Sequence, residues 1–139
     1  MSIFILDASV TLAWCFEDES THYTEAILDE LSGSSEAVVP VLWPYEVVNA
    51  LAVAERQSRI TLAKSSLFLD RLSGFPIFID SSDRARVFEQ VLPTARARGL
   101  SAYDAAYLEL AIREGLPLAT LDVDLRKAAK AAGVRIMAG

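Results

Sequence analysis

Residues 3–10 read IFILDASV: a short apolar run ends at Asp7 and passes directly into a segment with helical spacing. Short runs of β-branched and aromatic residues, bounded by turn residues or helix starts, predict strands. Four further runs of this kind follow, at residues 37–39, 77–79, 118–120 and 135–137. The sequence therefore predicts five strands, and the first of them ends immediately before an acidic side chain.

Apolar residues recur at helical spacing between these runs, which predicts helices at 9–16, 21–31, 44–57, 62–72, 83–98, 102–113 and 125–132. The expected helix ends are marked by Gly33, Gly74, Gly99, Gly115 and Gly133. Strands that alternate with helices form right-handed crossovers and a parallel sheet covered on both faces. We therefore expect an α/β fold with a five-stranded parallel sheet flanked by helices, an α/β/α sandwich.

Length and composition limit the class of protein. The chain has 139 residues, of which 53% are hydrophobic and 23% charged, and this predicts a single globular domain over residues 1–139. The longest apolar run, residues 37–45, is far below the ~20 residues that span a bilayer. No basic residue precedes the first apolar run, so a secretory signal is not supported, and we expect a cytoplasmic protein. A lone Cys15 and a lone His22 favour neither a disulfide nor a zinc site.

Charge is distributed unevenly along the chain. The net charge of −6 argues against a nucleic-acid partner, because phosphate contacts are made largely by Lys and Arg. However, residues 1–55 contain ten acids and no base, whereas residues 56–139 hold all 13 bases against nine acids, which gives −10 and +4. Candidate phosphate contacts are Arg56, Arg59, Lys64, Arg84, Arg86, Arg96, Arg98, Arg126, Lys127 and Lys130. The alternative is that these side chains form ordinary solvated helix faces.

Four acidic residues are expected at the edge of the sheet where the parallel strands end. Asp7 and Asp122 each follow a predicted strand directly, and ligands of such sheets collect at this edge. Glu46 and Asp104 fall in the first turns of helices that start from the same edge. Each tops a helical stripe that otherwise faces inward. The pattern thus predicts a cluster of carboxylates.

Each acid alone has a simpler explanation. Acids in a first turn favour the helix dipole, Ser101 and Asp104 have the spacing of a capping box, and Asp7 and Asp122 could be N-caps. Together, however, four carboxylates without an obvious Lys or Arg repel one another, by ~4 kcal/mol for a pair ~4 Å apart at an effective dielectric of 20. A divalent cation offsets this repulsion, and hard oxygen ligands suit Mg²⁺ or Mn²⁺.

Neighbouring polar residues can support such a site. Asp124 is an auxiliary acid for a second ion or a water, while Ser9 and Thr120 can donate hydroxyl hydrogen bonds to the carboxylates. Ser9 could equally be an N-cap. Asn49 can orient Glu46 or satisfy a helix carbonyl. Asp80 also ends a predicted strand, but the serines that follow it indicate a helix start and a structural role.

Four segments in order resemble the PIN-domain ribonucleases, most closely the VapC-type toxins of toxin–antitoxin pairs. They read ILDASV (5–10), PYEVVNAL (44–51), LSAYDAAYL (100–108) and LATLD (118–122), so the resemblance spans nearly the whole chain. It implies a Rossmann-like fold and Mg²⁺- or Mn²⁺-dependent endonuclease action on RNA. By motif, Asp7 and Asp104 resemble the principal metal ligands, Glu46 completes the acidic set and Asp122 is the fourth acid. The division of labour between Asp122 and Asp124 stays open.

The resemblance also implies partners and a mechanism. A metal-activated water hydrolyses the phosphodiester bond and leaves 5′-phosphate and 3′-hydroxyl ends, with Glu46 or Asp122 positioning the water or a second ion. A VapB-type antitoxin with a DNA-binding end blocks the acidic site, and a homodimer is expected. The main alternative is a catalytically silent PIN-like scaffold. A haloacid-dehalogenase-like phosphatase is disfavoured because Ser9 stands where the second aspartate of its motif belongs. A receiver domain is disfavoured because its acidic pair and its lysine are not evident in this sequence.

Overall fold

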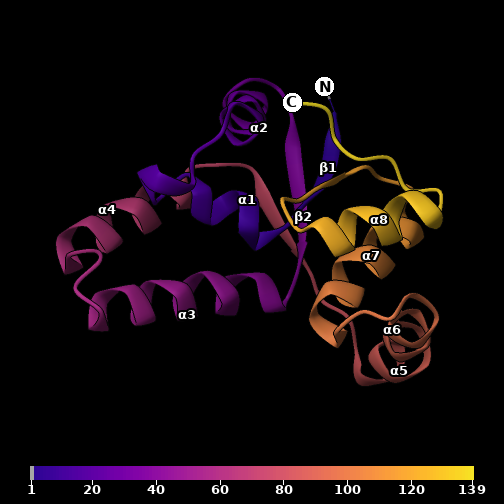
Figure 1. The fold of residues 1–139 in the computed structure, drawn as a ribbon. Coiled ribbons are helices and arrows are strands. Elements are labelled where there is room, and N and C mark those ends of the chain that lie inside the picture. Colours follow the sequence, from indigo (N-terminus) through magenta and orange to yellow (C-terminus); the bar gives the residue numbers. More distant parts are fainter. Residues whose placement is uncertain (1) are drawn as a thin grey trace.

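A parallel sheet of four strands forms the centre of the molecule (Figure 1). The computed structural model describes residues 2–139. The strands are β1 (Ile3–Leu6), β2 (Glu36–Pro40), β3 (Ile77–Asp80) and β4 (Leu118–Ala119), in the spatial order β3-β2-β1-β4. Every neighbouring pair is parallel. The α/β class and the parallel sheet flanked by helices are therefore confirmed.

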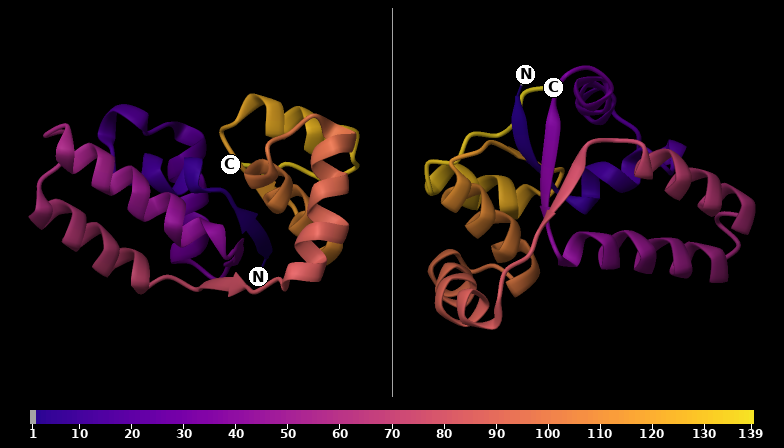
Figure 2. Two further views of the ribbon diagram at one scale, coloured as in Figure 1. Left: turned by 90° about the horizontal axis from the view of Figure 1, so that it is seen from below. Right: turned by 180° about the vertical axis from the view of Figure 1, so that it is seen from behind.

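Helices cover both sides of this sheet. One side carries α1 (Ala8–Ala13), α3 (Leu42–Arg56) and α4 (Leu62–Ser73), while α2 (His22–Ser32) contacts α1. The other side carries α7 (Ala102–Glu114) and α8 (Val123–Ala131) (Figure 1). Helices α3 and α4 run side by side as a hairpin that projects from the sheet, as both views in Figure 2 show. No helix among residues 2–139 is long and apolar enough to cross a membrane.

The predicted fifth strand is reduced to a single bridge. Residues 135–137 run beside β4, where Leu118 donates its N–H to the Arg135 carbonyl at 2.9 Å and accepts from Met137 at 2.8 Å. Only the pair Leu118 and Ile136 is bridged in parallel. β4 itself has two residues, so it offers too short an edge for a longer ladder. The prediction of five strands was therefore wrong, because the sheet has four strands and residues 135–137 contribute only this bridge.

The helix predicted over residues 83–98 is divided into three parts. These are α5 (Arg84–Arg86), a π-helical turn η2 (Val87–Val91) and α6 (Leu92–Arg98). Pro93 lies in the first turn of α6 and has no N–H to continue the regular ladder, which accounts for the irregular turn before it. The helix expected over residues 9–16 was also too long, because α1 ends at Ala13 and a separate turn of 3₁₀ helix, η1 (Glu17–Glu19), follows.

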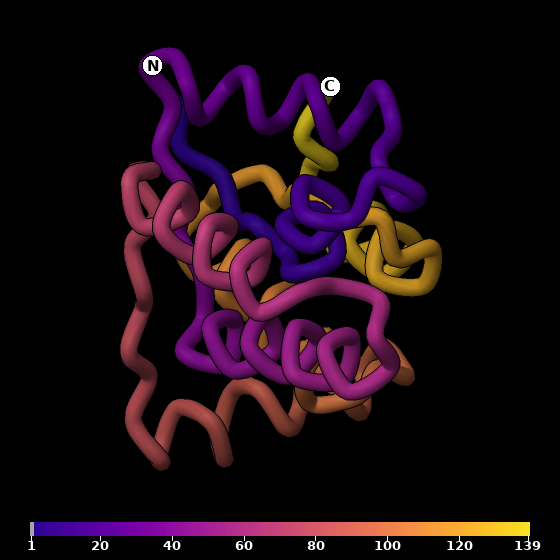
Figure 3. The backbone as a smooth tube through the Cα atoms, turned by 90° about the vertical axis from the view of Figure 1, so that its left-hand side faces the viewer, coloured from indigo at the N-terminus to yellow at the C-terminus, as the bar shows by residue number. Residues whose placement is uncertain are grey.

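The core lies around β1, whose last three residues Phe4, Ile5 and Leu6 are completely buried. A central parallel strand is covered on both faces, so its side chains are apolar without alternation. The opposite condition holds at β3, the edge strand, where Phe78 and Ile79 are each about half exposed. Figure 3 shows this segment running alone along one side of the molecule. Because β1 is buried, Asp7, which follows its last residue, is held in a fixed position.

Candidate active site

The end of β1 places Asp7 at the centre of the candidate site. Asp7 is extended at the position before α1, but its side chain does not cap that helix. Instead Oδ2 accepts hydrogen bonds from Ser9 Oγ and Thr120 Oγ1, both at 2.7 Å. Asp7 is only 6% exposed, and this burial raises the pKa of its carboxyl although the two hydroxyls oppose the shift. Asp7 thus occupies the N-cap position of α1 without capping it through the side chain, and Ser9 lies inside α1 and not at its cap.

Glu46 reaches the site from the first turns of α3 and is held there by a tyrosine. Tyr107 Oη donates to Glu46 Oε1 at 2.6 Å, across 61 residues of sequence. Tyr107 is completely buried on α7. Burial raises the pKa of Glu46, the hydrogen bond from Tyr107 opposes this, and the charges of Asp7 and Asp104 add to the rise. Glu46 therefore belongs to the same electrostatic cluster as both aspartates.

Asp104 and Asp122 complete this cluster from α7 and from the start of α8. Burial and the charges of Asp122, Asp7 and Asp124 raise the pKa of Asp104 to about 6. Ser101 Oγ accepts from the Asp104 N–H at 3.1 Å, but the Asp104 side chain accepts no return hydrogen bond from the Ser101 N–H, so only half of the predicted capping box forms. Asp122 caps its helix as the alternative predicted, since its Oδ1 accepts from the Leu125 N–H at 2.8 Å. Asp122 is therefore an N-cap that also acts electrostatically on its neighbours.

We call Asp7, Glu46, Asp104, Asp122 and the adjoining Asp124 the acidic site. In the described part of the chain, residues 2–139, no ion pair joins these carboxylates to a Lys or Arg. As placed, no three acidic, imidazole or thiol groups in that range converge on a single point for direct coordination. Mg²⁺ commonly uses one or two carboxylates and keeps several waters. Hard oxygen donors that lie in one electrostatic cluster and lack a basic partner therefore fit such an ion.

Comparison with known proteins identifies the family of this fold and site. The sequence matches the PIN domain family over residues 4–131. The chain belongs to the PIN domain family. A curated relative, Exonuclease VapC9 of Pyrobaculum aerophilum, is 37% identical over 89 residues, which cover 63% of this chain and 63% of the relative. The matched part thus spans less than two thirds of that protein.

Solved structures extend the comparison to the whole PIN domain. PAE2754 from Pyrobaculum aerophilum is 28% identical, with a TM-score of 0.69 over 91% of this chain and 79% of the other. VapBC2 from Rickettsia felis, solved bound to a DNA fragment from its promoter, gives a TM-score of 0.68 at 12% identity and covers 97% of both chains. The second likeness shows the fold alone. Together with the family match and the relative Exonuclease VapC9, this confirms the resemblance to VapC-type PIN domains.

Several other residues singled out in the sequence make no hydrogen bond or ion pair with the acidic site of this PIN domain. Asn49 is exposed, and its side chain makes no hydrogen bond to any described residue, so neither predicted role for it is seen. Asp80 accepts from Arg113 at 3.2 and 3.0 Å, a structural pairing that lowers its pKa. Two predicted phosphate contacts are also paired: Arg59 with Asp18 and Glu19, and Arg86 with Glu109.

Tyr107 is the residue of the site whose role the sequence did not predict. Its spacing of three from Asp104 places both on one helix face, and the pattern of that face predicts an inward-facing stripe. A buried phenol needs a hydrogen-bond partner. The only signal in the sequence was therefore a tyrosine, and not a phenylalanine, on a stripe that also carries an acid.

Proposed function

We propose that this PIN domain is a metal-dependent endoribonuclease and the toxin of a toxin–antitoxin pair. The observation that carries the proposal is the acidic site itself. Its carboxylates lie at the carboxyl edge of the sheet and have no basic partner among residues 2–139, and burial together with neighbouring carboxylates raises the pKa of Asp7, Glu46 and Asp104. Such a cluster is costly for a folded protein unless a cation offsets it.

The residues present suggest how the reaction is divided among them. Asp7 and Asp104 would hold Mg²⁺ or Mn²⁺, which when bound lowers the pKa of a coordinated water and offsets charge on the phosphate. Ser9 and Thr120 fix the orientation of Asp7 through two short hydrogen bonds. Glu46, fixed by Tyr107 and with a raised pKa, accepts a proton from the attacking water. Asp122 uses one oxygen for its cap and keeps the other for the site.

Endonuclease action distinguishes this proposal from the activity in the name of the relative Exonuclease VapC9. An exonuclease needs a free chain end, whereas an endonuclease cuts a circular RNA. We therefore propose a test with one RNA sequence in linear and circular forms. Cutting of both at similar rates supports endonuclease action, and cutting of the linear form alone contradicts it.

The proposed partners follow from the charge of the site and from the family. A VapB-type antitoxin would place an Arg among the carboxylates, since a guanidinium pairs well with such a cluster. The likeness in fold to VapBC2, which was solved bound to a DNA fragment from its promoter, and to a toxin–antitoxin complex from Klebsiella pneumoniae supports a partner of this kind. RNA as substrate, action in the cytoplasm and a homodimer with two acidic sites complete the proposal.

The decisive experiment measures RNA cleavage by the purified protein freed from any bound partner. Reactions contain Mg²⁺, Mn²⁺ or a chelator, and compare the wild type with Asp7→Asn and Asp104→Asn. Asp70→Asn is the matched control, because Asp70 is exposed on α4, away from the acidic site. Circular dichroism verifies that each variant folds.

Metal-dependent cutting that leaves 5′-phosphate ends, and that is lost in both site variants but retained in Asp70→Asn, supports the proposal. Cutting that persists in Asp7→Asn and Asp104→Asn would assign the activity to a contaminant. No cutting with either ion, together with no binding of Mg²⁺, would favour a catalytically silent scaffold.

A further inference from the structure

A cavity opens on the same edge of the sheet as the acidic site. Its volume is about 230 Å³, and its lining includes Pro40 and Asp80, the last residues of β2 and β3. The rim residues Val41 and Tyr103 are 50% and 66% exposed, whereas Leu110 at the inner wall is 1% exposed. The cavity is therefore a pit that opens to solvent. It is smaller than the ~300–1,000 Å³ pockets that enclose a whole small ligand, so it suits one part of a larger molecule.

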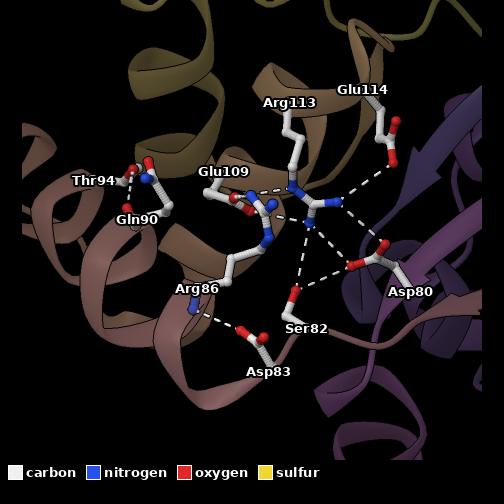
Figure 4. A network of polar contacts seen from close by, with 9 residues as sticks. All are labelled: Asp80, Ser82, Asp83, Arg86, Gln90, Thr94, Glu109, Arg113 and Glu114. Carbon is white, nitrogen blue, oxygen red and sulfur yellow. Dashed lines mark hydrogen bonds and ion pairs between the residues drawn. The ribbon is translucent and has the colours of Figure 1, made fainter.

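The polar end of this cavity is built from Asp80, Ser82, Glu109 and Arg113, which we call the polar floor (Figure 4). Arg113 donates to Asp80 Oδ1 and Oδ2 at 3.2 and 3.0 Å, and to Glu109 Oε1 and Oε2 at 3.0 and 3.3 Å. Ser82 Oγ donates to Asp80 Oδ2 at 3.1 Å. From the other side, Arg86 Nη1 donates to Glu109 Oε1 at 3.2 Å. The side chains of the polar floor are thus held in place by hydrogen bonds to one another.

The hydrogen-bonding capacity that this floor leaves open is that of an acceptor. The guanidinium of Arg113 uses Nε on Glu109, Nη1 on Asp80 and Glu114, and Nη2 on Asp80 and Glu109, so its five N–H groups are engaged. Each carboxylate has about four lone-pair positions. Asp80 and Glu109 each accept three hydrogen bonds from the described residues. A ligand that presents an N–H group can therefore be bound here.

The chain connects this cavity closely to the acidic site. Tyr103 lines the cavity, and the next residue on α7 is Asp104. Leu42 lines it as well, and Glu46 lies one turn further along α3, about 6 Å along the helix axis. Both sites also lie at the carboxyl edge of one parallel sheet. A single extended chain can therefore reach both.

One wall of the cavity belongs to a positively charged segment, residues 84–98, which we call the basic arm. It supplies Val87 and Val91 to the lining and comprises α5, η2 and α6. The arm contains four arginines and one glutamate, in a chain whose net charge is −6. Arg84, Arg96 and Arg98 are exposed. An apolar pit with one wall formed by a segment that carries exposed arginines is complementary to a polymer with flat bases and anionic phosphates.

We propose that this cavity binds one base of an RNA substrate, next to the phosphate that is cleaved at the acidic site. This inference rests on the proposed ribonuclease function. The base inserts between the apolar walls and Tyr103, while the basic arm contacts the flanking phosphates. Acceptors at the floor favour a base with an exocyclic amino group, which adenine, cytosine and guanine have, over uracil, whose ring N–H is flanked by two carbonyl oxygens that the carboxylates repel. The cavity thus determines sequence preference, and the acidic site performs the hydrolysis.

The test fills the cavity and measures base preference. Ala106 lines the cavity and is partly buried, so Ala106→Phe places a ring in it; Ala97→Phe, on an exposed face of α6, is the matched control. Binding of a short RNA is measured by fluorescence anisotropy in the presence of chelator, with each base in turn replaced by an abasic residue. The same RNAs with each single position changed to uridine are then assayed for cleavage.

We expect wild type and Ala97→Phe to lose about tenfold in affinity when one particular base is removed, and to cleave about tenfold more slowly with uridine there. Ala106→Phe should show a flat abasic scan and no base preference. An abasic scan that is flat for the wild type would overturn the inference even if RNA is cut. An Ala106→Phe protein that keeps the wild-type base preference would also overturn the inference. If Ala106→Phe only changes the protein from dimer to monomer, the cavity is occupied by a second copy and the inference is likewise overturned. No cleavage by the wild type, with a sharp abasic scan, refutes the ribonuclease proposal alone.

Discussion

Replacing Asp104 by Asn should stabilise the protein in the absence of metal ions. The pKa of Asp104 is raised from 3.8 to about 6 by burial and by the charges of Asp122, Asp7 and Asp124. Each unit of pKa difference between folded and unfolded states corresponds to about 1.4 kcal/mol, or about 3 kcal/mol here. Since the side chain is only partly buried, solvent screening reduces the expected gain to about 1–2 kcal/mol at pH 7. The melting temperature should rise by about 3–8 °C.

The pH dependence gives this effect a characteristic sign. A carboxyl whose folded pKa is raised favours the folded state when protonated, so wild type loses stability as the pH rises from about 4 through about 6. The difference between Asp104→Asn and wild type should therefore vanish at pH 4 and be complete at pH 7. Asp70→Asn should show no such difference. Added Mg²⁺ should raise the melting temperature of wild type and reduce the gap.

The stability difference between Asp104→Asn and wild type is measured by thermal unfolding in the presence of chelator at several pH values, with circular dichroism as the signal. If the main role of Asp104 were to favour the helix dipole of α7, the same substitution would cost about 0.3–1 kcal/mol. Lower stability of Asp104→Asn at pH 7 would therefore refute the reasoning. The Ser101 cap uses the backbone N–H of residue 104 and is retained in the variant, so it does not blur the outcome.

Three further results are expected. Tyr107→Phe removes the hydroxyl that donates to Glu46 at 2.6 Å, so the pKa of Glu46 rises further. The acid limb of the pH–rate profile should therefore shift to higher pH. The control is Tyr45→Phe, which should leave the profile unchanged because Tyr45 is exposed. Thr120→Val removes a donor to Asp7 and should shift the same limb upward, with recovery in Thr120→Ser. Arg113→Met leaves buried Glu109 with Arg86 alone and should cost about 2–4 kcal/mol in urea unfolding, whereas exposed Arg71→Met should cost under about 0.5 kcal/mol.

The sequence predicted those parts of the fold that depend on local pattern. β1 begins and ends where its apolar run does, and Asp7 follows it as expected. Such strands are recognisable because a covered parallel strand is apolar throughout. The weak edge at residues 135–137 was overestimated for the same reason, since an apolar run does not reveal how long a neighbouring strand is.

Contacts between residues far apart in the sequence could not be predicted from residue spacing. Tyr107 and Glu46 are 61 residues apart, and Arg113 and Asp80 are 33 apart, so no helical or strand period connects either pair. The acids of the site could be proposed because topology alone brings strand ends to one edge. Their supporting hydrogen bonds depend on how α3, α7 and the strands pack. Asn49 shows the converse, because it shares a stripe with Glu46 yet remains exposed.

The central claim is that the carboxylates of the acidic site form one divalent-cation site. Titration of Mn²⁺, followed by the loss of its free-ion paramagnetic resonance signal, tests this without any RNA. Wild type and Asp70→Asn should bind the ion, and Asp7→Asn and Asp104→Asn should each bind it at least about tenfold more weakly. Equal Mn²⁺ affinity in all four proteins, or no binding by the wild type, would contradict the account.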